Sequence, residues 1–143
     1  MAILLVRHGS AGSRKRWKGD DRDRPLDKRG RGQARALVAQ LAGYPVGRIL
    51  TSSYVRCVAT VEPLAETLGM AIDTCDDLAE GASVHRTLEL LRAAADETPV
   101  VCTHGDVILG LIGERRKMQK GSVWILEPHG NDFAPAVYLS PPR

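Results

Sequence analysis

The stretch that decides the fold is AILLVRHG, residues 2–9. Its first part, Ala2–Val6, is an uninterrupted apolar run, which is typical of a parallel strand buried on both faces. The run stops at Arg7 and His8, whose side chains carry charge or take up protons. A buried strand that ends in such residues predicts an α/β protein with polar chemistry at the end of this strand.

The rest of the chain alternates strand and helix patterns. Short runs of the strand type recur in five further segments: Arg48–Ser52, Ala71–Thr74, Pro99–Thr103, Gly121–Glu127 and Ala134–Leu139. Apolar residues at helical spacing indicate four helices: one capped by Asp27, one over Tyr54–Leu68, one capped by Ser83 and one over Val107–Ile112. Pro63 falls inside the second helix, so we expect a kink or a split there.

This order of elements predicts a single-domain α/β/α sandwich over residues 1–143. Strands that alternate with helices form a mostly parallel sheet with helices on both faces. The last two strands are joined by the turn signal His129-Gly130-Asn131-Asp132, so we expect an antiparallel C-terminal edge hairpin. The length suits one domain, and the sequence contains no internal repeat, low-complexity tract or linker.

The composition narrows the classes of partner and location. With 20 Lys+Arg against 17 Asp+Glu, the net charge is +3, which favours neither nucleic-acid nor membrane binding. No apolar run approaches the length of a membrane span, and the first run is too short for a secretion signal. The three cysteines are widely spaced, as expected for free thiols in a reducing compartment. We therefore predict a cytoplasmic protein whose oligomeric state is open.

Charged and polar residues follow the predicted strands at the edge where ligands bind in such sheets. The predicted substrate-binding residues are those that follow the first, second and third strong strand signals: Arg7, Gly9, Ser10, Arg56, His104 and Gly105. His8 and Glu80 also follow predicted strands, and their side chains can accept or donate a proton. Because the carboxyl ends of parallel strands meet at one edge, we expect all of these residues to lie together.

These residue types suit phosphoryl transfer. A neutral imidazole such as that of His8 is a nucleophile near neutral pH. The guanidinium groups of Arg7 and Arg56 match phosphate oxygens in pairs. A carboxylic acid, with Glu80 favoured over the nearby Asp76 and Asp77, can protonate a leaving group. Glycines beside the histidines let the backbone approach a ligand closely.

Other phosphate chemistries lack their sequence patterns here. The chain contains neither GxxxxGK[ST] nor HExxH, and no cysteine is followed six residues later by an arginine. We therefore expect no metal ion and no cofactor. Each candidate residue has an ordinary explanation when taken alone, since a single histidine or arginine after a strand is common. Their convergence at one sheet edge is what favours the enzymatic interpretation.

Four blocks in chain order resemble the histidine phosphatase superfamily, the phosphoglycerate-mutase-like proteins: LVRHG (5–9), RPLDKRG (24–30), SSYVRCVAT (52–60) and THG (103–105). The resemblance implies His8 as the nucleophile, with Arg7, Arg56 and His104 in the phosphate pocket and Glu80 as the proton donor. Ala59 and Ser53 stand where the family pattern has Gln and Pro.

The short length is similar to that of the SixA-type branch, which implies a phosphohistidine on another protein as the substrate. An alternative resemblance links residues 12–30 to the phosphatase half of MutT-type Nudix proteins, which implies a nucleotide or another small phosphate ester. Residues 12–31 carry nine Lys/Arg against four Asp, a local excess that suits either kind of substrate. A third interpretation is a phosphate-binding module without turnover.

Overall fold

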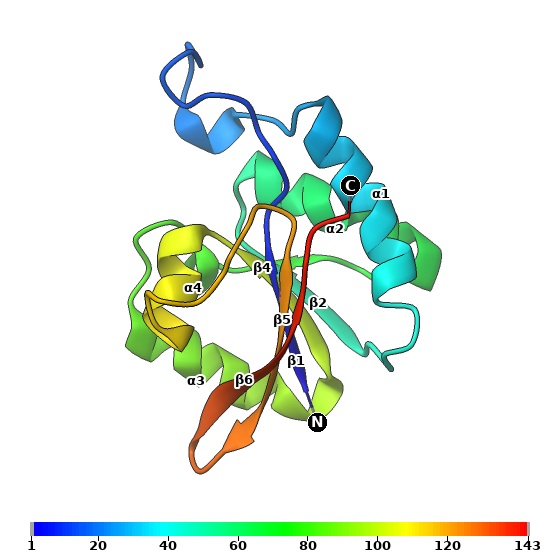
Figure 1. Cartoon of the computed structure of the whole chain (residues 1–143), viewed down its shortest axis with the longest axis vertical. Coiled ribbons are helices and arrows are strands. Elements are labelled where there is room, and N and C mark those ends of the chain that lie inside the picture. The colour runs from blue at the N-terminus through cyan, green and yellow to red at the C-terminus, as the bar shows by residue number, and fades with distance from the viewer. Residues whose placement is uncertain (1, 143) are drawn as a thin grey trace.

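The computed structural model describes residues 2–142 and centres on a six-stranded sheet with the order β3-β2-β4-β1-β5-β6. The strands are β1 (Ile3–Arg7), β2 (Arg48–Thr51), β3 (Asp73–Thr74), β4 (Pro99–Thr103), β5 (Val123–His129) and β6 (Asp132–Leu139). The first four are parallel to one another, whereas β5 runs antiparallel to both β1 and β6. The predicted mostly parallel sheet with an antiparallel C-terminal pair is thus confirmed (Figure 1).

Helices cover both faces of the sheet (Figure 1). They are α1 (Lys28–Gln40), α2 (Val55–Leu68), α3 (Val84–Ala94) and α4 (Gly105–Ile112). Leu4 and Val6 of β1 belong to the core cluster of α1 and α2, whereas Ile3 and Leu5 belong to the cluster of α3 and α4. Successive residues of a strand point to opposite faces, so an uninterrupted apolar run is what a strand between two helical layers requires.

Side-chain caps mark the starts of α1 and α3. The side chain of Asp27 accepts the N–H of Gly30 at 2.8 Å and caps α1, as predicted. The helix α4 begins at Gly105 rather than at the predicted Val107. The N–H of Ile108 donates to the carbonyl oxygen of His104 at 3.1 Å, which draws the glycine into the first turn although its own helix propensity is low.

Two other expectations about the elements are corrected. The helix α2 is not split at Pro63 but remains helical throughout. Its residues Leu64 and Ala65 are buried in the core beside the proline, and this packing holds the helix together despite the missing N–H donor. The strand β3 covers only Asp73–Thr74 and pairs with the end of β2.

The segment between β1 and α1 extends beyond one end of the sheet (Figure 1). It is a loop, as expected, apart from one turn of 3-10 helix over Asp21–Asp23. Within residues 2–142, no helix is long and apolar enough to cross a membrane.

Candidate active site

The two candidate histidines follow neighbouring parallel strands. In the register of β1 and β4, Arg7 lies opposite Thr103, and the N–H of His8 donates to the carbonyl oxygen of Thr103 at 3.2 Å. His104 follows immediately, so the pairing of the strands brings both imidazoles to one place. Their ring centroids lie 5.4 Å apart with an interplanar angle of 64°.

His8 is buried, with 5 % of its surface exposed, and its environment keeps it uncharged. Burial lowers the pKa of His8 to about 3, and the positive charge of Arg56 acts in the same direction. The Nδ1 atom lies 2.8 Å from the Gly9 carbonyl oxygen. Because a carbonyl only accepts, Nδ1 carries the proton and the lone pair is on Nε2. His8 therefore offers a neutral nitrogen nucleophile at neutral pH.

His104 is positioned by the start of α2. Its Nε2 lies 2.8 Å from the Ser52 hydroxyl oxygen, and that oxygen also accepts the N–H of Tyr54 at 3.3 Å. When the hydroxyl donates to Nε2, the proton of the imidazole is on Nδ1. Nδ1 is buried and has no partner within residues 2–142, so it remains a donor for a ligand.

Two arginines leave further donors unpaired. Arg56, in the first turn of α2, is 1 % exposed. Arg7, at the end of β1, is fixed by donation from its Nη1 to the Met118 carbonyl oxygen at 2.6 Å. The Nε atoms of both arginines are buried without a partner in the described part of the chain. Unpaired buried donors are costly, so together with His104 they fit a bound anion such as phosphate.

The glycines beside the histidines are required by close packing. A Cβ atom on Gly105 would lie 3.1 Å from Cζ of Arg7, and one on Gly9 would lie 3.1 Å from Cα of Gly30. The amide of Gly9 donates to the Thr60 hydroxyl oxygen at 3.0 Å. These contacts place the two glycines at the predicted edge, each beside a group that a larger residue would displace.

Ser10 has a structural partner. Its hydroxyl donates to the Asp27 carboxylate at 2.6 Å, the same carboxylate that caps α1. Its backbone N–H donates to Oε1 of Gln33 at 2.9 Å. Ser10 therefore joins the end of β1 to the start of α1, next to the histidine that it follows.

Glu80 lies at the entrance of the site, bound to arginines. Its Oε2 is 3.7 Å from Nη2 of Arg56, and its Oε1 is 2.5 Å from Nη2 of Arg14. The predicted proton donor is thus beside the arginine cluster, but its oxygen is already occupied by a cation.

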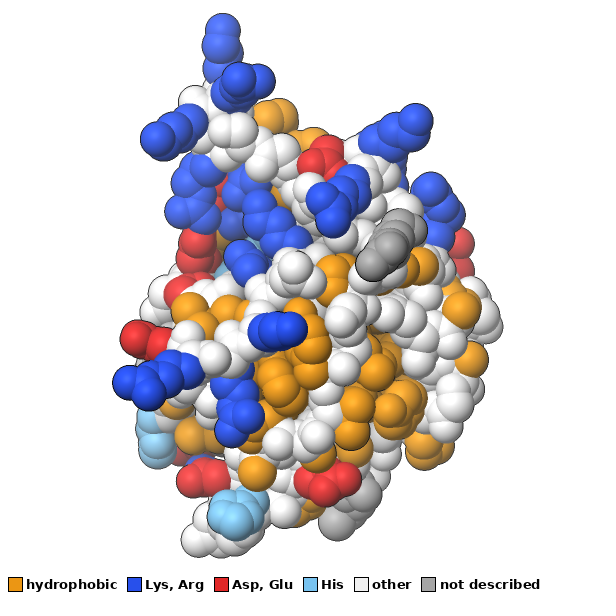
Figure 2. Space-filling model, viewed as in Figure 1, with side chains coloured by type: hydrophobic (Ala, Val, Ile, Leu, Met, Phe, Trp, Pro, Cys, Tyr) orange, Lys and Arg blue, Asp and Glu red, His pale blue; other side chains and the backbone are white. Residues whose placement is uncertain are grey.

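The structure also brings in residues that the sequence did not single out. Asp21 forms ion pairs with two arginines. Its Oδ2 is 3.0 Å from Nη2 of Arg56, and its Oδ1 is 3.0 Å from Nε of Arg24. Arg14 reaches the same carboxylate at 3.6 Å. Lys and Arg side chains gather over this end of the molecule (Figure 2). The only sequence signal for them was the local excess of positive charge.

We also searched the described residues for side chains that could bind a metal ion together. Among residues 2–142, no three His, Cys, Asp or Glu side chains form a group that could hold a metal ion.

Comparison with known families agrees with this arrangement. Residues 3–84 match the model of the histidine phosphatase superfamily, branch 1. The chain belongs to the histidine phosphatase superfamily. This membership confirms the family resemblance of the sequence blocks.

One curated relative is a much longer protein than this chain. It is the 8-oxo-(d)GTP phosphatase of Mycolicibacterium smegmatis (strain ATCC 700084 / mc(2)155), which is 45 % identical over 157 aligned positions. The match covers 98 % of this chain but 48 % of the relative. The chain therefore spans about half the length of the curated relative it matches.

Solved structures share the fold of this histidine phosphatase. The protein histidine phosphatase SixA with tungstate has a TM-score of 0.83 at 21 % identity, covering 99 % of this chain and 97 % of that chain. Phosphoserine phosphatase of Entamoeba histolytica has a TM-score of 0.76 at 16 % identity, covering 97 % and 96 %. These two likenesses extend over nearly the whole chain and show the shared fold.

Proposed function

We propose that this histidine phosphatase acts through a covalent phosphohistidine on His8, without a metal ion. The observation that carries the proposal is the neutral, buried His8 with its lone pair on Nε2. Around it stand three buried nitrogen atoms, on Arg7, Arg56 and His104, that have no hydrogen-bond partner within residues 2–142. A phosphoryl group would satisfy these donors while its phosphorus faces the nucleophile.

The reaction then has two steps. First, Nε2 of His8 forms a bond to phosphorus while the bond from phosphorus to the leaving group breaks. Second, a water oxygen attacks the phosphohistidine, the P–N bond breaks, and inorganic phosphate and a proton are released. In both steps charge builds on the phosphoryl oxygens, where Arg7 and Arg56 stabilise it. His104 donates through Nδ1 to the same oxygens.

The pairing of Glu80 with Arg14 bears on the leaving group. An alkoxide or an imidazole leaves well only when it receives a proton. Glu80 is the predicted donor, but its Oε1 is engaged by the Arg14 guanidinium at 2.5 Å. A phosphate leaving group departs as an anion without that proton, and Arg14 can neutralise its charge. This arrangement favours a phosphoanhydride over a simple ester.

We therefore propose a nucleoside polyphosphate as the substrate. Two observations support this choice. The curated relative bears the name 8-oxo-(d)GTP phosphatase, and residues 12–31 supply nine cations against four carboxylates next to the site. A row of phosphates binds such a segment more tightly than a single phosphate does.

A phosphohistidine on another protein is the second candidate. The likeness to SixA over nearly the whole chain supports it. So does the short segment of residues 81–98 between Glu80 and β4, because a small cover leaves room for a protein surface. In that case the substrate is a phosphorylated protein and not a small molecule.

The mechanism is tested with His8→Ala. We expect the wild-type chain to release phosphate from p-nitrophenyl phosphate in excess EDTA and the variant to release none, because the nucleophile is gone. Brief reaction of the wild type with a labelled substrate should trap an acid-labile, base-stable phosphoprotein that is absent in the variant. Full activity of His8→Ala would contradict the role of His8. If the wild type bound phosphate without any turnover, the enzymatic mechanism would be rejected and the chain would be a phosphate-binding module.

The substrate class is tested with Arg14→Met on the two candidate substrates. For a nucleoside triphosphate, we expect kcat/KM to fall roughly tenfold, because Arg14 no longer neutralises the leaving phosphate. For a phosphohistidine peptide, we expect no loss, because Glu80 is released from its ion pair. The matched control is Arg35→Met, which removes an exposed cation outside residues 12–31. A wild-type preference for the peptide would overturn the nucleotide proposal while leaving the mechanism intact.

A further inference from the structure

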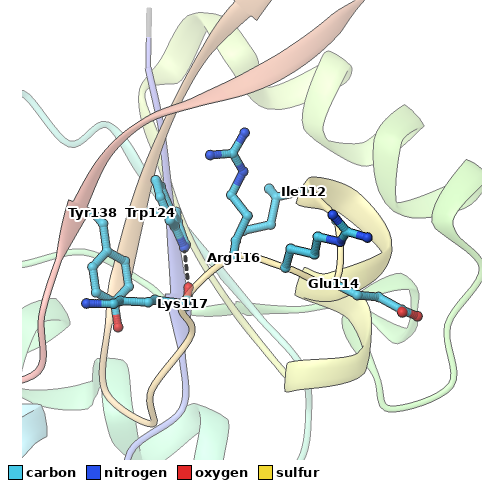
Figure 3. A pocket seen from close by; sticks show the side chains of 8 residues that line it. Ile112, Glu114, Arg116, Lys117, Trp124 and Tyr138 are labelled. Atoms are coloured by element: carbon cyan, nitrogen blue, oxygen red, sulfur yellow. Dashed lines mark hydrogen bonds between the residues drawn. The ribbon is translucent and has the colours of Figure 1, made fainter.

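A second cavity lies apart from the histidines, between the end of α4 and the β5–β6 hairpin. We call it the hairpin cavity; it is lined by Ile112, the segment of residues 113–117, Trp124 and Tyr138, and encloses about 600 Å³. Its side chains come from the end of α4, the following segment and the hairpin (Figure 3). None of them belongs to the candidate active site. The volume lies within the range of small-molecule sites.

The floor of the hairpin cavity is a fixed pair of aromatic rings. The ring centroids of Trp124 and Tyr138 lie 5.0 Å apart at 44°. The indole N–H of Trp124 donates to the Lys117 carbonyl oxygen at 2.7 Å, the bond drawn in Figure 3. The Tyr138 hydroxyl oxygen accepts the N–H of Gln119 at 3.2 Å. Both rings thus have their polar atoms engaged by the connecting segment and are half-buried, so they offer flat apolar surface rather than polar groups.

The rim of the hairpin cavity is cationic. Arg115, Arg116 and Lys117 are consecutive and exposed, and within residues 2–142 none of them is in an ion pair. Cζ of Arg116 lies 5.8 Å from the ring centroid of Trp124. Glu114 is the one acidic residue among the lining residues. In Figure 2 an apolar area lies on this face with cationic side chains beside it.

We infer that the hairpin cavity is a second binding site, for a ligand that joins a flat aromatic ring to a phosphate. The faces of Trp124 and Tyr138 suit stacking with a flat ring. The unpaired cations of the rim suit phosphate oxygens. The chemical class that presents both features together is a nucleoside phosphate. This inference does not depend on what His8 does.

Tryptophan fluorescence tests the site, because the chain has two tryptophans and only Trp124 is at the cavity. In the double variant His8→Ala, Trp17→Phe, turnover is blocked and Trp124 alone reports. With adenosine 5′-monophosphate as the probe, we expect saturable quenching as the base stacks on the indole. Inorganic phosphate, which lacks a ring, should leave the signal unchanged. No saturable quenching at millimolar probe would overturn the inference, and so would equal quenching by phosphate.

Charge reversal on the rim supplies the second arm. In the same background, Arg116→Glu should weaken the dissociation constant for the probe roughly tenfold or more, because a cation that faces the phosphate becomes an anion. Arg35→Glu, on the exposed side of α1, makes the same change in net charge and should leave the constant unchanged. Circular dichroism melting confirms that each variant is folded. Equal weakening by both substitutions would show a general charge effect and overturn the site.

Discussion

At the scale of single residues, the main feature of the site is a set of buried nitrogen atoms that have no hydrogen-bond partner in the described chain. Arg7, Arg56 and His104 each hold a buried N–H without a partner in the described chain. An unsatisfied buried donor costs about 1–3 kcal/mol, so these three groups favour the binding of an anion with several oxygen atoms. Oδ2 of the Asp21 carboxylate already pairs with Nη2 of Arg56 at 3.0 Å. A phosphate that enters must compete with this carboxylate, and it brings more oxygens than one carboxylate has.

The position of Arg7 gives a sharp residue-scale prediction. In Gly105→Ala, the new methyl group would lie 3.1 Å from Cζ of Arg7, so the guanidinium must shift. We expect kcat/KM to fall roughly 10- to 100-fold, because a small displacement of a phosphate-binding group is costly in the transition state. Steady-state kinetics measure it. Gly43→Ala, where a Cβ atom has open space, is the control. Unchanged kinetics in Gly105→Ala would show that Arg7 needs no fixed position.

At the scale of elements, the sequence predicts strands better than loops. The first strand was predictable over Ala2–Val6 because a strand between two helical layers is apolar on both faces, and the structure places it at Ile3–Arg7. The meeting of His8, His104, Arg7 and Arg56 followed from topology, since parallel strands share a carboxyl edge. Asp21 and Arg14 were beyond such reasoning. Their contacts with Arg56 and Glu80 span 35 and 66 residues of sequence and depend on the path of an irregular loop.

The start of α1 provides an element-scale prediction with an internal control. A Cβ atom on Gly30 would lie 2.0 Å from the carbonyl oxygen of Ser10, whereas one on Gly32 has only an arginine end group at 3.9 Å. We expect Gly30→Ala to lower the free energy of unfolding by about 1–3 kcal/mol or more, because α1 must move away from the end of β1.

Gly32→Ala should instead raise the free energy of unfolding by about 0.5–1 kcal/mol through better helix propensity. Urea unfolding measures both changes. Equal effects of the two substitutions would mean that the contact of Gly30 with Ser10 is not tight in solution.

At the scale of the whole molecule, stability and chemistry are linked through protons. Folding lowers the pKa of His8 from the ordinary 6.5 to about 3, chiefly through burial. The unfolded chain therefore binds a proton at this residue over a pH range in which the folded chain does not. Stability falls as pH falls from about 6.5 towards 3, with a slope of up to about 1.4 kcal/mol per pH unit from this group.

The corresponding prediction concerns His8→Gln. Between about pH 6.5 and pH 4.5, the free energy of unfolding of this variant should depend less on pH than that of the wild type, because the titrating group is gone. Urea unfolding across this range measures the two slopes. Parallel slopes would show that His8 is not held neutral by the fold.

The register of β1 and β4 determines which changes of sequence the two histidines can tolerate. His8 and His104 are neighbours because Arg7 lies opposite Thr103, and the distance between adjacent strands is about 4.8 Å in any sheet. The separation of the two backbone positions that carry the imidazoles is thus set by the hydrogen bonding between β1 and β4. Loops can lengthen and core residues can be exchanged over evolutionary time without disturbing it. A one-residue slip of β4 could not be tolerated, because it would turn His104 to the other side of the sheet.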